Sequence, residues 1–112
     1  MKEEMETILG YVVGESKIDY VGFWQILGYV DSIFRPTDAE SRKGLALEVV
    51  RAILRNGLEA VDLASGAGCT PWPDQNPDAV IKRIADEWAA LGHDPNPGEG
   101  VWFHDPNLKP VD

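Results

Sequence analysis

The chain has 112 residues, of which 44% are hydrophobic and 26% charged, and these values are typical of a single globular domain. Ten basic against nineteen acidic residues give a net charge of −9, which disfavours binding to phosphate backbones and favours binding to basic surfaces. A single cysteine, Cys69, excludes an internal disulfide, and no apolar run approaches the roughly 20 residues that span a bilayer. The N-terminal residues are acidic and lack the basic start of a signal peptide, so we expect a cytoplasmic protein.

The first third of the chain predicts two helices. Residues 2–13 repeat apolar side chains at helical spacing, and Gly14 is a suitable end for that helix. The Ser-x-x-Asp spacing of residues 16–19 is typical of a helix cap, so we expect a second helix from there to about Phe34. Its apolar positions, Trp24 among them, form a wide stripe, which indicates a central helix that is covered on more than one side.

A proline marks the clearest boundary in the chain. Pro36 ends the second helix, and Thr37 and Glu40 directly after it have the spacing of a capping box. A third helix is predicted from about Asp38 to Asn56, where an Asn-Gly pair is a strong helix stop.

Two short strands and a fourth helix are predicted in the second half. Residues 58–63 alternate apolar and polar side chains, and residues 101–104 form another short apolar run. Residues 65–76 lie between them as a loop rich in proline and glycine. An Asn-Pro start then predicts a helix over residues 77–91 that stops at Gly92.

These elements predict an α+β fold that is mainly helical, with about four helices and a small two-stranded β-ribbon. We expect one domain over residues 1–106 and a loose C-terminal tail over residues 107–112. Up to Leu63 the order helix, helix, helix, strand resembles the winged-helix family, so the fold is described as winged-helix-like. The helix over residues 77–91, which comes between the two strands, departs from that family.

The winged-helix resemblance implies that the third helix reads DNA. That helix carries four basic residues that could do so, namely Arg42, Lys43, Arg51 and Arg55. Glu40 and Glu48 lie among them at spacings typical of surface ion pairs, and the net charge of −9 opposes binding to a phosphate backbone. Nucleic-acid binding is therefore an alternative function rather than the first one.

A second resemblance points to a protein partner. The Trp24 helix, the stretches "ALEVVRAILRNGLEAVDL" and "VIKRIADEWAALG", and the final "VWF" resemble small acidic bacterial proteins that include immunity proteins. The resemblance implies an acidic surface that covers a basic protein partner, such as a toxin's nuclease domain. The first functional hypothesis is therefore a protein–protein interaction module.

The acidic and aromatic residues of the last half are the predicted partner contacts. Residues 65–112 hold eight of the nineteen acidic residues and three of the ten basic ones. Trp72 stands between two prolines and either fills a gap in the core, which we favour, or stands exposed as an interface anchor. The predicted partner-binding set, which includes an outward-facing Trp102 and one acidic rim, is Trp72, Asp74, Asp78, Glu99, Trp102 and Asp105.

A small metal-dependent enzyme is the remaining alternative. It would use two segments, His93-Asp94 and His104-Asp105, if these segments meet in the fold, which the sequence leaves open. Cys69 has no base beside it in the sequence, and neither a phosphate-binding loop nor a nucleophile motif is present. We therefore expect no enzymatic activity, no metal and no cofactor.

Overall fold

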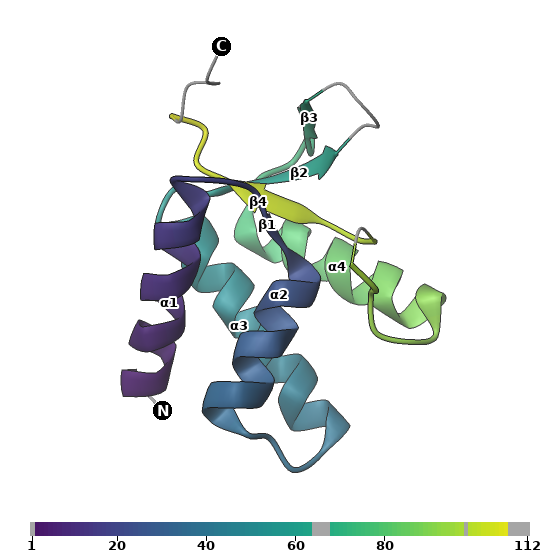
Figure 1. The fold of residues 1–112 in the computed structure, drawn as a ribbon. Helices are drawn as coiled ribbons and strands as arrows, with labels where there is room; N and C mark the ends of the chain where they lie inside the picture. Colours follow the sequence, from purple (N-terminus) through teal and green to yellow (C-terminus); the bar gives the residue numbers. More distant parts are fainter. Residues whose placement is uncertain (1, 64–67, 98, 108–112) are drawn as a thin grey trace.

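The computed structural model describes residues 2–63, 68–97 and 99–107. The fold is α+β, with four helices and a four-stranded antiparallel sheet, and the helices lie together on one side of the sheet (Figure 1). The helices are α1 (Lys2–Ser16), α2 (Phe23–Tyr29, continued by a π-helical turn over Val30–Phe34), α3 (Ala39–Arg55) and α4 (Pro77–Leu91). The strands are β1 (Val21–Gly22), β2 (Glu59–Leu63), β3 (Cys69–Pro71) and β4 (Trp102–His104).

The sheet contains the predicted strand pair and two strands that the sequence did not predict. β2 and β4 pair antiparallel, with Ala60 opposite Phe103, which confirms their predicted pairing. The prediction of a two-stranded ribbon is wrong, because β1 pairs with the other edge of β4 and β3 with the other edge of β2, in the order β1-β4-β2-β3. The winged-helix arrangement is not shown by this topology, in which β3 and α4 separate β2 from β4 along the chain.

The predicted helix cap at residues 16–19 is wrong. Helix α1 continues past Gly14 to Ser16, whose hydroxyl donates to the Val13 carbonyl at 2.7 Å. The chain is then extended through β1, and α2 begins only at Phe23. The N-terminus of α2 is capped by a residue of its own first turn, because the Gln25 side-chain oxygen accepts a hydrogen bond from the Gly22 N–H at 2.7 Å.

The predicted starts and ends of the later helices agree closely with the structure. Helix α3 starts one residue late, because Asp38 rather than Thr37 caps it and accepts from the Ser41 N–H at 2.7 Å. Asn76 caps α4, with a proline in its first turn, and Gly92 ends it in the left-handed conformation at φ 77°, as predicted.

A proline of β3 protects the edge of the sheet. The Trp72 N–H donates to the Ala60 carbonyl at 2.9 Å, so this N–H points across the sheet toward β2. Alternation then turns the nitrogen of Pro71 toward the open edge, where it has no N–H to offer a further strand. The Trp72 side chain is 3% exposed, which confirms the favoured prediction that it fills the core.

The core lies between the helices and the face of the sheet that carries Val21, Ala60 and Phe103. Side chains from all four helices complete it, with Ile8 from α1, Ile26 from α2, Ile53 from α3 and Val80 from α4 fully buried. Trp24, predicted in the apolar stripe of the second helix, is only partly buried, and Trp88 of α4 is partly buried where it packs against the core. No helix in the described ranges is long and apolar enough to cross a membrane. Of the predicted tail, residues 108–112 lie outside the described residues.

Candidate binding site at the C-terminal end of helix α4

After α4 the chain reverses direction, and the residues that follow form one wall of a hollow at the C-terminal end of that helix. Gly92 ends α4, and residues 93–97 and 99–101, which we call the returning segment, lead back to β4. In the turn of this segment the Glu99 N–H donates to the Asn96 carbonyl at 2.8 Å. The Glu99 carboxylate closes the same turn by accepting from the Asn96 N–H at 2.9 Å. Pro95 is buried under this turn, so the returning segment is packed against α4.

The hollow on one side of Trp88 is an apolar pocket of about 250 Å³, which we call the α4 pocket. Phe23 forms part of its wall and meets Trp88 edge to face, with ring centroids 5.3 Å apart. The lining residues come from α2, α4 and the returning segment, and they are Phe23, Ile84, Glu87, Trp88, Leu91, Pro95, Glu99, Gly100 and Val101. A concave apolar surface with few polar groups is the usual form of a ligand site.

Two carboxylates are the charged groups among the described lining residues. Glu87 is in the last turns of α4, and its carboxylate accepts from the Arg83 guanidinium at 2.8 Å. Glu99 reaches the pocket from the returning segment. Arg83 does not line the pocket and stacks instead on Trp72, 3.7 Å from the ring centroid. The charged lining residues are therefore acidic, and Glu99, which has no ion-pair partner among the described residues, favours a positively charged ligand group.

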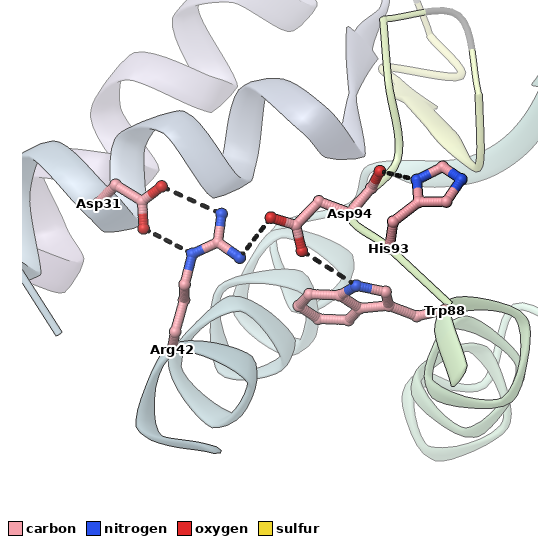
Figure 2. Close-up of polar contacts among 5 residues, drawn as sticks. All are labelled: Asp31, Arg42, Trp88, His93 and Asp94. Carbon is pink, nitrogen blue, oxygen red and sulfur yellow. Dashed lines mark hydrogen bonds and ion pairs between the residues drawn. The ribbon is translucent and has the colours of Figure 1, made fainter. Parts of the chain in front are cut away.

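Figure 2 shows how an ion cluster fixes the returning segment on α3. The Arg42 guanidinium donates to Asp31 at 2.7 and 3.0 Å and to Asp94 at 2.8 Å. Asp94 also accepts from the Trp88 indole N–H at 3.3 Å. The hydrogen bond to Asp31, followed by the one to Asp94, raises the pKa of Arg42. The cluster thus holds Trp88 and the wall of the α4 pocket in place.

A second hollow, of about 310 Å³, lies on the other side of Trp88. Arg42, Lys43 and His93 line it, and the Lys43 ammonium lies 6.0 Å from the centroid of the Trp88 ring. The cations of this region therefore lie outside the lining of the α4 pocket, separated from it by Trp88.

The basic residues of α3 do not form one cationic stripe. Arg42 is bound by Asp31 and Asp94, while Arg51 is bound by Asp78 at 2.6 Å and lies 3.7 Å from Glu48. Lys43 lies at Trp88, and Arg55 is exposed in the last turn of α3. This arrangement gives no support to α3 as a DNA-reading helix.

The predicted acidic rim is divided over the molecule. Asp78 is in the first turn of α4 and is paired with Arg51, whereas Glu99 lies beside Leu91 at the other end of this 15-residue helix. The carboxylates of Asp74 and Asp105 accept from backbone N–H groups in their own turns, at 2.9 Å each. Of the four predicted acidic residues, only Glu99 lines the pocket.

The two predicted aromatic contacts differ in their exposure. Trp72 is buried, and its indole N–H donates to Asp62 at 2.9 Å, so it offers no exposed anchor. Trp102 points away from the core, as predicted, because its neighbour Phe103 is fully buried on the opposite face of the sheet. It is half-buried there, with its ring over Gly22.

The two histidines contact different residues. The His93 ring Nδ1 lies 2.7 Å from the Asp94 carbonyl, and His104 Nε2 lies 2.9 Å from the Glu59 carboxylate across the β2–β4 pair. Cys69 Sγ is 4.0 Å from the same His104 nitrogen. Within the described ranges, no three His, Cys, Asp or Glu side chains are grouped so as to hold a metal ion.

Comparisons of this chain with protein-family models, with curated proteins and with solved structures find no match. Its function must therefore be inferred from its own residues. The residues that the sequence did not single out are Glu87 and the apolar wall around it. They come from three separate segments, and the sequence carries no local signal that brings Phe23, Leu91 and Pro95 together.

Proposed function

We propose that this chain is an acidic interaction module that binds a basic protein surface, with the α4 pocket taking an apolar side chain of the partner. The observation that carries the proposal is the lining of this pocket, which consists mostly of apolar residues and has Glu87 and Glu99 as its charged members. Apolar anchors that enter a pocket beside charged groups are the usual centre of a protein interface.

The net charge supports the same kind of partner. At −9 the chain attracts basic surfaces over the range of its field and repels nucleic acid. Masking of a toxin domain, as the resemblance to immunity proteins implies, is one form of such binding. The nucleic-acid alternative has less support, because two of the four basic residues of α3 are each occupied by carboxylates.

The proposal is tested by capture of a partner from the source cells with two matched variants. Leu91→Arg places a cation at the pocket, whereas Ala90→Arg adds the same charge at the exposed neighbouring position outside the lining. We expect a basic protein to be retained by the wild type and by Ala90→Arg, and to be lost with Leu91→Arg. Circular dichroism checks that both variants remain folded.

The affinity of the purified partner should also fall as salt rises, because electrostatic attraction is screened. An acidic partner, affinity that does not change with salt, or equal binding by the two variants would contradict the proposal. Retention of duplex DNA by the wild type in place of a protein would favour the winged-helix alternative.

A further inference from the structure

We infer that the α4 pocket selects an apolar group that carries a positive charge, so that its ligand is a hydrophobic ammonium or guanidinium compound or a partner side chain of that combined character. This inference rests on the proposed function and specifies what the pocket recognises. It is carried by the size of the pocket, by its aromatic wall and by the placement of its two glutamates.

The volume limits the ligand to one small group. At about 250 Å³ the pocket is smaller than the roughly 300–1,000 Å³ of sites that take drug-sized molecules. A single aromatic or branched aliphatic group suits this volume. Phe23 and Trp88 provide the aromatic walls that such a group would contact.

The charged groups around the pocket are arranged asymmetrically. Glu87 and Glu99 reach the lining from two different segments, α4 and the returning segment. The Glu99 carboxylate is held by the Asn96 N–H at 2.9 Å, so it is positioned before any ligand arrives. A carboxylate next to an apolar wall attracts a cation more strongly than one in open water, since the local dielectric constant is lower.

An anionic ligand would find no matching group among the described lining residues. The nearby cations Arg42 and Lys43 line the other hollow, and Arg42 is occupied by Asp31 and Asp94. Arg83 already binds Glu87, whereas Glu99 has no ion-pair partner among the described residues, so Glu99 in particular favours a ligand that is apolar and positively charged.

The test uses three small probes of similar shape and different charge at constant ionic strength, namely phenethylammonium, 2-phenylethanol and 3-phenylpropanoate. Binding is followed by NMR at the backbone amides of Gly100 and Val101 and at the indole N–H of Trp88. We expect phenethylammonium to bind about tenfold more tightly than the alcohol, which corresponds to one favourable charge interaction. The carboxylate probe should bind more weakly than the alcohol.

Charge variants show whether the two glutamates cause this preference. In the double variant Glu87→Gln/Glu99→Gln, the ammonium and the alcohol should bind with equal affinity. The control Glu3→Gln/Glu6→Gln removes two charges from exposed positions in α1 and should keep the wild-type preference. Equal affinities of the three probes for the wild type, loss of preference in the control, or shifts outside the pocket would overturn the inference.

The outcomes separate this inference from the proposed function. If a basic partner is captured and lost with Leu91→Arg while the probes show no charge preference, the proposed function stands and the inference is wrong. If the probes bind with the expected preference and no basic protein is captured, the pocket is a site for small cations and the proposed protein docking is wrong.

Discussion

At Gly22 the absence of a side chain determines how the sheet meets the helices. A Cβ at this position would lie 2.5 Å from Nε1 of Trp24 and 3.2 Å from the Trp102 ring, so both tryptophans close directly over the backbone. The glycine therefore permits β1 and the start of α2 to lie under two large rings. The sequence did not indicate this role, because the two rings meet Gly22 only in the folded chain.

Substitution of this glycine should be costly. Gly22→Ala is expected to destabilise the fold by about 1–3 kcal/mol through overpacking against Trp24. Gly44→Ala is the matched control, because Gly44 lies within α3 and a Cβ there meets nothing within 4 Å. It should stabilise by about 0.5–1 kcal/mol through helix propensity. Urea denaturation measures both, and equal effects of the two substitutions would contradict this account of Gly22.

Asp38 gives a prediction with a defined dependence on pH. The backbone N–H and the hydroxyl of Ser41 donate to its carboxylate and hold the pKa of Asp38 below its ordinary value. Because the folded-state pKa is lowered, the cap stabilises α3 above the unfolded-state pKa of about 3.9 and loses this effect as pH falls through the folded-state pKa.

Asp38→Ala should therefore lower the melting temperature at neutral pH, and the difference from the wild type should shrink as pH falls below about 4. Asp38→Asn should keep the cap without this pH dependence, since an amide oxygen also accepts from the Ser41 N–H. A melting-temperature difference between wild type and Asp38→Ala that stays constant from pH 7 to pH 3 would show that the carboxylate charge is irrelevant here.

At the scale of elements, two arginines of α3 hold α4 antiparallel to it. Arg42, near the start of α3, binds Asp94 just after the end of α4, and Arg51, near the end of α3, binds Asp78 at the start of α4. The α4 pocket lies at the Arg42 end of this pair. The cluster of Asp31, Arg42 and Asp94 therefore links helix packing to the shape of the pocket wall (Figure 2).

Removal of the Arg42 side-chain charge tests this link. Arg42→Met should destabilise the fold by about 1 kcal/mol, since its two carboxylate partners are about half-exposed and solvent screens part of the attraction. It should also shift the NMR signals of the Trp88 indole and of Gly100, because the Asp94 contact is lost. Lys82→Met removes an ion pair with Asp86 on the exposed side of α4 and should change neither quantity measurably. Unchanged pocket signals in Arg42→Met would contradict the proposed link.

The helices and strands also show which parts of this fold can be predicted from the sequence. The helices α3 and α4 were predicted almost to the residue, because their caps, periodicity and stop signals are local. The strands β1 and β3 contain two and three residues, too few to show alternation, and they are strands only through pairing with β4 and β2. The start of α2 was misplaced for the same reason, since a strand precedes it.

At the scale of the whole molecule, net charge and charge placement are separate properties. The sequence establishes −9, but it does not show that Asp31, Asp78 and Asp94 are bound by arginines from α3. Of the four acidic residues in the predicted rim, only Glu99 consequently lies at the pocket. Glu87 is bound by Arg83, as its spacing in the sequence suggests, and it also lines the pocket once α2 and the returning segment have packed.

The most direct test of the account compares how tightly the captured basic partner binds two proteins of equal net charge. Glu87→Gln/Glu99→Gln and Glu3→Gln/Glu6→Gln both lose two negative charges, so long-range attraction is matched between them. We predict a dissociation constant about tenfold weaker than wild type for the first and within about twofold for the second. Equal dissociation constants for the two variants would show that the partner responds to overall charge alone and that the α4 pocket is not where it docks.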